Sequence, residues 1–212
     1  MRMLRLGCVM ALAALPALAA DTLGLLFATP HLAALKPGDE LAYDHRRQAS
    51  SPELAGGGRE ELILLRLEGG EKPGVTVTLD AEGRARQLEP FRGTSGNPIL
   101  MVFLESVVGA TAKATGGSPF YLRNRVKEGL RERLSERPVT FPAATGPMAA
   151  REFRMQPFAG DAHLAELGAF AGLELRFVLA EAAPGMILLL AARTPEGAEP
   201  AYSEEIRLAT HP

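Results

Sequence analysis

The sequence predicts an α+β fold in which a curved antiparallel β-sheet, open or half-barrel-like, carries two central helices packed on one face. Two observations predict it. Strand-like segments joined by short turns occupy both halves of the chain, and short turns favour antiparallel pairing. Between the two halves, residues 97–134 carry the periodicity of two consecutive helices. The element order is therefore a short helix, four strands, two helices and about four further strands.

One helix-start pattern occurs three times, as a capping residue, a proline and then an apolar run. It is seen at Thr29-Pro30, Asn97-Pro98 and Ser118-Pro119. The capping side chain can accept a hydrogen bond from a first-turn amide, and proline needs no amide at that place. Gly116 and Gly117 suit the left-handed end of a preceding helix. The pattern predicts a short helix after Pro30 and two longer ones after Pro98 and Ser118.

The two longer helices differ in their side-chain patterns. Glu105 is the only charged residue between Ile99 and Val108, so the first helix is expected to be buried in the core. The second has an apolar face with a basic stripe beside it. The face consists of Leu122, Val126, Leu130 and Leu134, and the stripe of Arg123, Lys127 and Arg131. The stripe is expected to be a solvated face with ion pairs, or alternatively a contact surface for a head group or an acidic partner.

Strands are predicted on both sides of the helices. Residues 41–46 alternate, with Leu41, Tyr43 and His45 on one face, and residues 61–67 are almost continuously apolar. Residues 75–89 give two strands around a turn at Asp80 to Gly83. After the helices, strands are predicted at 151–156, 173–179, 186–192 and 202–208. The intervening residues 161–171 allow either a helical turn or a loop.

The N-terminus has the pattern of a secretory signal peptide. Arg2 and Arg5 precede an uncharged apolar run that is too short to span a bilayer, and small residues at Ala19 and Ala20 suit cleavage. We therefore expect a signal peptide over residues 1–20, one domain over residues 21–212, and a periplasmic or secreted protein without a transmembrane segment. Cys8 lies within the apolar run, so the mature chain is expected to lack cysteine and thiol chemistry.

Composition and motifs exclude several functional classes. The whole chain has a formal charge of −2, which is no electrostatic footprint for nucleic acid. Neither a Gly-x-Gly-x-x-Gly nor a phosphate-loop motif occurs, and the histidines have no metal-site spacing, so no cofactor or metal is expected. His45 is expected to be a hydrogen-bonded histidine at the edge of the core. The pairs Glu60-Glu61 and Glu204-Glu205 are expected to face solvent.

The leading functional hypothesis is a non-enzymatic envelope protein that binds an apolar or amphiphilic, lipid-like ligand in the concave face of the sheet. By element order the fold resembles the periplasmic half-barrels that carry lipoproteins or lipids, which implies a ligand-lined concave face. The predicted ligand contacts are Tyr43, Leu64, Val77, Phe103, Phe120, Tyr121, Phe153 and Phe177. Contacts to a head group or partner are predicted for Arg123, Lys127 and Arg131.

Two alternatives remain open from the sequence. In the first, the chain is a structural or interaction module that docks an envelope protein through the basic stripe. In the second, Ser95 in the segment Gly-Thr-Ser-Gly serves as the nucleophile of a hydrolase, although the sequence does not single out a histidine base or an acidic partner. Phe103, Phe120 and Tyr121 are expected to pack against each other and the sheet if they contact no ligand.

Overall fold

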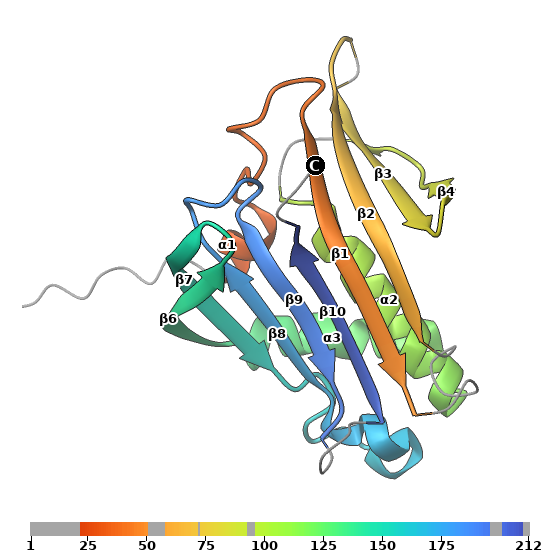
Figure 1. The fold of residues 1–212 in the computed structure, drawn as a ribbon. Coiled ribbons are helices and arrows are strands. Elements are labelled where there is room, and N and C mark those ends of the chain that lie inside the picture. Colours follow the sequence, from red (N-terminus) through yellow and green to blue (C-terminus); the bar gives the residue numbers. More distant parts are fainter. Residues whose placement is uncertain (1–21, 51–57, 72, 93–95, 196–200, 210–212) are drawn as a thin grey trace, which may run out of the picture.

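The protein forms one ten-stranded antiparallel sheet that has helices α2 and α3 on one face and does not close into a barrel (Figure 1). This is the α+β architecture that the sequence predicts. The computed structural model describes residues 22–50, 58–71, 73–92, 96–195 and 201–209. The predicted signal peptide, residues 1–20, lies outside the described residues.

The elements follow the chain in two groups of strands separated by the helices. The first group contains α1 (Thr22–Phe27), β1 (Glu40–Ala49), β2 (Arg59–Glu68), β3 (Gly74–Ala81), β4 (Arg84–Gln87) and β5 (Phe91–Arg92). The helices are α2 (Ile99–Thr115) and α3 (Pro119–Glu132). The second group contains β6 (Ser135–Ala143), β7 (Gly146–Met155), the 3-10 helix η1 (Leu164–Gly172), β8 (Glu174–Leu179), β9 (Ile187–Arg193) and β10 (Tyr202–Leu208).

The strand order explains why the helices lie across the sheet. It runs β4-β3-β2-β1-β10-β9-β8-β7-β6, with β5 paired to β3. The first strands step outward to one edge, α2 and α3 carry the chain to the other edge, and the last strands step back until β10 pairs with β1 (Figure 1). The β1–β10 pair at the centre thus joins strands from the two ends of the described chain, and it is the only neighbouring pair that joins the two groups of strands.

Asn97 fixes the start of α2 against the sheet. Its Oδ1 accepts a hydrogen bond from the Ile99 amide at 3.1 Å, which is the predicted capping interaction. Its Nδ2 donates to the Tyr43 hydroxyl and to the Gly185 carbonyl, both at 3.0 Å. The other end of α2 has Gly116 at φ 70°, as predicted. One buried amide therefore holds α2, β1 and the β8–β9 turn together.

Two helix-start predictions are corrected. Residues 31–34 after Pro30 form turns, and the short helix precedes them as α1. Ser118 precedes Pro119 at the start of α3, but its hydroxyl makes no capping hydrogen bond. In the link between α2 and α3, the Thr115 hydroxyl accepts a hydrogen bond from the Gly117 amide at 3.1 Å. The local signals therefore located the start of α3 correctly, but the predicted capping hydrogen bond is not formed.

The side of the sheet that faces α2 and α3 is filled by packed side chains. Phe103 of α2 and Phe177 of β8 meet edge-on, with ring centroids 6.0 Å apart. Both are 0% exposed, and they belong to one continuous apolar cluster with residues of every strand from β1 to β3 and from β7 to β10. The predicted burial of the first long helix is confirmed, because Ile99, Leu100, Phe103, Leu104, Val107 and Val108 are buried.

A second, smaller apolar cluster lies on the opposite face of the sheet. Phe141 and Ala150 of the β6–β7 hairpin pack there against Val178 of β8 and Leu189 of β9. Val178 follows Phe177 in β8, so its side chain points to the opposite face of the sheet. Because Phe177 points toward the helices, Val178 and Glu152, its partner in register, point away from them. The hairpin thus covers part of the face that carries no helix, which we call the helix-free face.

Candidate functional site

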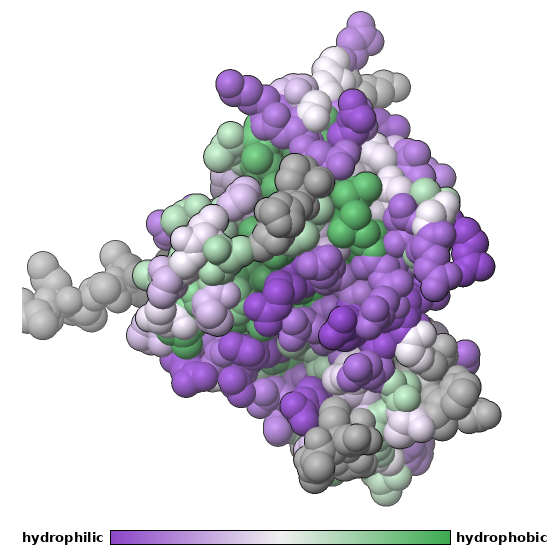
Figure 2. All heavy atoms as spheres, viewed as in Figure 1, coloured by the Kyte–Doolittle hydropathy of each residue, from purple (hydrophilic) through white to green (hydrophobic). Residues whose placement is uncertain are grey.

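The helix-free face carries a groove of about 790 Å³ across the middle of the sheet. Its lining comes from β1, β2, β7, β8, β9 and β10. Figure 2 views this face and shows a hydrophilic band across it, with hydrophobic residues gathered above. The groove is therefore bounded by two surfaces of opposite character.

A repeated sequence pattern supplies the charges of the groove. Four strands carry an acidic residue two positions before an arginine, at Asp44-x-Arg46, Glu152-x-Arg154, Glu174-x-Arg176 and Glu205-x-Arg207. A spacing of two places both members on the same face of a strand. The register puts all four pairs on the helix-free face, because Asp44 is opposite Arg207 and Arg154 is opposite Arg176. The strands thereby form a charged ladder across the sheet.

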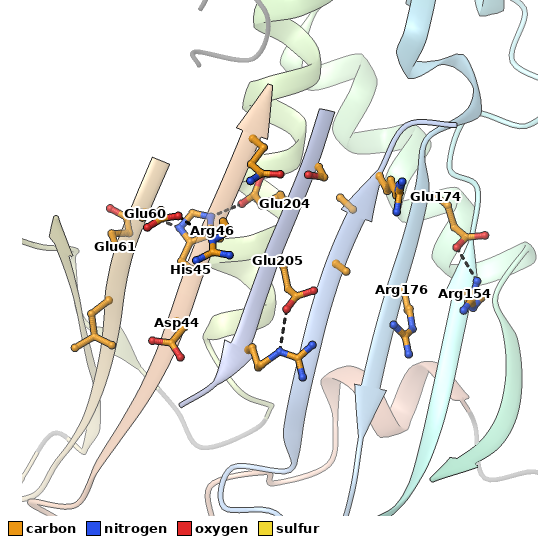
Figure 3. Close-up of a pocket in the computed structure, with 17 residues that line it drawn as sticks. Asp44, His45, Arg46, Glu60, Glu61, Arg154, Glu174, Arg176, Glu204 and Glu205 are labelled. Carbon is orange, nitrogen blue, oxygen red and sulfur yellow. Dashed lines mark hydrogen bonds and ion pairs between the residues drawn. The ribbon is translucent and has the colours of Figure 1, made fainter. Parts of the chain in front are cut away.

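Strand β9 interrupts this ladder and makes the groove. Its helix-free side presents Leu189, Ala191 and Arg193, and Ala191 is opposite both Arg176 of β8 and Glu205 of β10. The longer side chains of Arg176 and Glu205 on the two neighbouring strands enclose a volume above Ala191. The small alanine side chain does not fill this volume. Figure 3 shows Arg154 and Arg176 on one side of the groove and Glu205, Asp44 and Arg46 on the other.

Most of the charges in the groove are paired. Arg46 contacts Glu60 at 2.9 Å, and Arg207 contacts Glu205 at the same distance. On the other side, Arg154 Nη1 lies 2.9 Å from Glu174. These pairs are largely exposed, so each contributes little to stability and serves mainly to orient the side chains.

Glu152 is the most strongly perturbed carboxylate beside the groove. Its side chain is 0% exposed and accepts hydrogen bonds from Arg137 at 2.6 Å, from Arg154 at 2.8 Å and from Arg176. Burial would raise the pKa of Glu152, but the hydrogen bonds from the three arginines lower it to about 2. Glu152 therefore stays ionised near neutral pH and gathers the arginines of three strands.

His45 forms a second buried polar network, on the helix-facing side of the same strands. Its Nδ1 lies 2.8 Å from Glu61 and its Nε2 lies 2.9 Å from Glu204. Burial would lower the pKa of His45, but the hydrogen bonds to Glu204 and Glu61 outweigh it and raise the pKa. Only an imidazolium can donate to both carboxylates at once. Tyr202 donates a further hydrogen bond to Glu204.

This network confirms one prediction and corrects another. His45 is a hydrogen-bonded histidine of the core edge, as the sequence predicts. The two glutamate pairs do not both face solvent, because Glu61 and Glu204 point to the helix side and are buried. Their neighbours Glu60 and Glu205 lie on the helix-free face. Adjacent residues of a strand point to opposite faces, and the hydrophobic pattern alone did not reveal that a buried histidine would pair with carboxylates.

The predicted ligand contacts fall into three groups in the structure. Tyr43, Val77, Phe103, Phe153 and Phe177 are brought together, each 0% exposed, in the packed core. Leu64 lies on the other face of the sheet, because its partner in register is Ala42, whereas the partner of Tyr43 is Ile63. The prediction that Leu64 shares the face of Tyr43 was therefore wrong. Contact of these residues with a ligand stays a prediction.

Phe120 and Tyr121 form the third group. Phe120 is 70% exposed, so the expectation that it packs against the sheet is wrong. Tyr121 donates a hydrogen bond to Asp161 at 2.8 Å and contacts the His163 ring edge-on. Both residues lie at the start of α3, on the helix side of the sheet and away from the groove.

The predicted basic stripe of α3 is partly neutralised. Arg123 forms two hydrogen bonds of 2.7 Å to Glu105 of α2, and these hydrogen bonds lower the pKa of the carboxyl. Lys127 and Arg131 are exposed and have no ion-pair partner among the described residues. The stripe therefore joins α2 to α3 rather than presenting three free cations.

Sequence reasoning missed the arginines of the groove. Arg154, Arg176 and Arg193 carry no family motif, and each reads as an ordinary surface residue when its strand is considered alone. The available signal was the acid-x-arginine pattern repeated in four strands. Ser95, the predicted minor nucleophile, lies outside the described residues.

Comparisons with known proteins identify no family. No protein-family model and no curated protein matches the chain. Among solved structures, the chain is similar to the crystal structure of the Mycobacterium tuberculosis lipoprotein LppX, at a TM-score of 0.34 and 9% identity over 85% of this chain and 90% of that chain. We draw no functional conclusion from a similarity of this size.

Over the described ranges, no helix has the length and apolar character needed to cross a membrane. Within the same ranges, histidine, cysteine and acidic side chains nowhere form a group of three or more that could hold a metal ion.

Proposed function

We propose that the chain is an exported protein of the cell envelope that binds an amphiphilic ligand in the groove of the helix-free face. The groove of about 790 Å³ carries this proposal. Its size falls within the roughly 300–1,000 Å³ of small-molecule sites. The opposite side of the sheet supports it indirectly, because packed side chains fill the space under the helices.

The surroundings of the groove favour an amphiphile over a purely polar ligand. Ala191 belongs both to the lining of the groove and to the apolar cluster of the β6–β7 hairpin. Arg207, which also lines the groove, lies over the ring of Phe141 at 5.2 Å. Val139 and Met148 are half-buried members of that cluster and offer apolar surface beside the charged ladder. A ligand with a polar head and an apolar chain would match both surfaces.

The proposal is tested by filling the groove from its floor. Ala191→Phe adds a large side chain between Arg176 and Glu205 while keeping a residue that strands favour. Protein purified from the periplasm is examined by native mass spectrometry before and after solvent extraction. We expect a lipid-sized adduct on the wild type. We also expect that the variant binds dodecyl phosphate at least about tenfold more weakly in isothermal titration calorimetry.

Ala85→Phe is the matched control. Ala85 is exposed on β4, opposite Asp80, so it shares the helix-free face but does not line the groove. We expect this variant to retain both the adduct and the wild-type affinity. The proposal fails if the wild type carries no adduct and binds neither dodecyl phosphate nor dodecyl maltoside below their micelle concentrations.

The docking alternative has less structural support. It depends on a free basic stripe on α3, and Arg123 is already bound to Glu105 there. The remaining exposed cations, Lys127 and Arg131, are ordinary features of a solvated helix.

A further inference from the structure

The β7–β9 side of the groove concentrates arginines around one buried carboxylate. Glu152 lies at the centre, opposite Arg137 in register, and Arg154 is directly opposite Arg176. Two arginines facing each other across strands repel. Glu152 compensates for this by accepting hydrogen bonds from both, and from Arg137. We call Arg137, Arg154, Arg176 and Arg193, together with Glu152 and Glu174, the arginine cluster.

The arginine cluster carries more positive than negative charge. Its four guanidinium groups are always charged near neutral pH, whereas it has only the two carboxylates Glu152 and Glu174. Glu205, another carboxylate that lines the groove, is paired with Arg207 at 2.9 Å. Among its members, Arg154, Arg176, Arg193 and Glu174 line the groove, so this side of the groove has two more positive than negative charges, whereas Asp44 and Glu205 line the opposite side.

Two arginines of the cluster retain free hydrogen-bond donors. Arg176 gives only its Nε to Glu152, and its terminal nitrogens have no partner among the described residues. Arg193 is exposed, and within the described part of the chain it makes neither an ion pair nor a side-chain hydrogen bond. Arg176 is directly opposite Ala191, and Arg193 lies two residues further along the strand of Ala191. Arg193 is therefore the diagonal neighbour of Arg176 on the same face. Long side chains at such positions reach a common point above the alanine.

We propose that Arg176 and Arg193 bind a phosphate group of the ligand above Ala191, with Glu152 and Arg154 positioning Arg176. A guanidinium offers paired donors that match two oxygens of a phosphate. The two excess positive charges match the charge of a phosphate monoester. The inference depends on the proposed function in that it names the head group of the ligand in the same groove. Lipid head groups and free phosphate compounds both carry such a group, and the probes below separate these two sources.

The experiment compares three probes by isothermal titration calorimetry on solvent-extracted protein. Dodecyl phosphate has the anion and the chain, dodecyl maltoside has the chain alone, and inorganic phosphate has the anion alone. We expect the wild type to bind dodecyl phosphate about tenfold or more tightly than dodecyl maltoside. We expect Arg193→Gln and Arg176→Gln each to bind dodecyl phosphate about tenfold more weakly than the wild type does. The affinity of both variants for dodecyl maltoside should be unchanged.

Arg193→Gln keeps the test decisive if Arg176→Gln fails to fold, since the Arg193 side chain is exposed and makes no ion pair or side-chain hydrogen bond within the described residues. Arg66→Gln is the matched control, because Arg66 is an exposed arginine of β2 that does not line the groove, and this variant should bind every probe as the wild type does. Arginine side-chain NMR signals supply a second readout, because phosphate should shift the terminal Nη–H signals of Arg176 and Arg193 but not those of Arg66.

Each outcome has one meaning. Equal wild-type affinity for dodecyl phosphate and dodecyl maltoside, or an unchanged affinity in Arg193→Gln, overturns the phosphate site and leaves the proposed amphiphile site standing. Inorganic phosphate that binds as tightly as dodecyl phosphate supports the phosphate site, assigns it to a free phosphate compound and overturns the amphiphile proposal. Binding of none of the three probes overturns both.

Discussion

Neighbouring glutamates in this sheet have opposite environments. Glu204 is buried against His45 and Tyr202, while Glu205 lies in the groove beside Arg207. Glu61 and Glu60 differ in the same way. A strand turns successive side chains to opposite faces, so one Glu-Glu dipeptide supplies both a core network and a groove. Charge at a residue therefore says little about its role until its face is known.

His45 gives a pH prediction at the scale of the residue. Its pKa is raised in the folded protein, so the stabilisation that it contributes is fully present below its ordinary pKa of about 6.5 and is lost as the pH rises through the folded value. The pKa of Glu61 is lowered, so its contribution is lost at acid pH instead. We expect His45→Gln to reduce the free energy of unfolding by about 3 kcal/mol between roughly pH 4.5 and 6.5.

Urea denaturation at several pH values measures this effect, and the loss should shrink as the pH rises above that window. His163→Gln is the control, because His163 also lies beside a glutamate, Glu166, but its side chain is 55% exposed. Solvent screening should keep the free energy of unfolding of this variant close to that of the wild type. A loss for His45→Gln that is equal at pH 5.5 and pH 9 would refute the ion-pair interpretation.

At the scale of the element, α3 approaches the sheet closely at one glycine. A Cβ on Gly129 would lie 3.1 Å from Pro157 Cα and 3.3 Å from Met155 Sδ. Gly109 of α2 also occupies a helical position, but a Cβ there meets nothing within 4 Å. The two glycines thus separate the effect of helix propensity from that of packing.

The corresponding substitutions should change stability in opposite directions. Gly109→Ala should raise the free energy of unfolding by about 0.5–1 kcal/mol, because alanine favours the helix. Gly129→Ala should lower it by about 1 kcal/mol, because crowding against Pro157 exceeds the same helix gain. Guanidinium denaturation followed by circular dichroism measures both. Equal stabilisation by the two changes would show that α3 can move away from β7 without loss.

At the scale of the whole molecule, the packed interior directs binding to the helix-free face. Phe103 and Phe177 are two of the predicted ligand contacts, and they fill the space where α2 crosses the sheet. Phe103→Ala should therefore lower the free energy of unfolding by about 3–5 kcal/mol, as expected when a large core side chain leaves a cavity. Thermal and chemical denaturation provide the measurement.

Phe120→Ala is the comparison, since Phe120 is 70% exposed and its truncation should cost less than about 0.5 kcal/mol. The two variants remove the same atoms from the two extremes of burial. If Phe103→Ala lowers the free energy of unfolding by less than about 1 kcal/mol, the space under α2 behaves as an open ligand cavity. The core residues that the sequence predicts as ligand contacts would then again be candidates for ligand binding.

The elements that the sequence located are those with strong local signals. Asn97 and Gly116 bound α2 as the capping pattern predicts, and Glu82 and Gly83, both with positive φ, form the turn between β3 and β4. The sequence analysis did not predict strand β6. Its prolines, Pro138 and Pro142, disfavour a strand in general, but β6 is an edge strand, where proline is tolerated. Propensity describes one segment and cannot report its position in a sheet.

The sequence by itself determined the α+β class, the two central helices and the burial of α2, because these depend on periodicity and caps within short segments. Only the tertiary structure decided that β10 pairs with β1, that Leu64 faces away from Tyr43, and that Arg154 and Arg176 meet at Glu152. Each of these depends on register between distant strands, and a shift of one residue would turn every side chain to the other face. Pairing across the sheet therefore creates the groove from residues that are unremarkable one at a time.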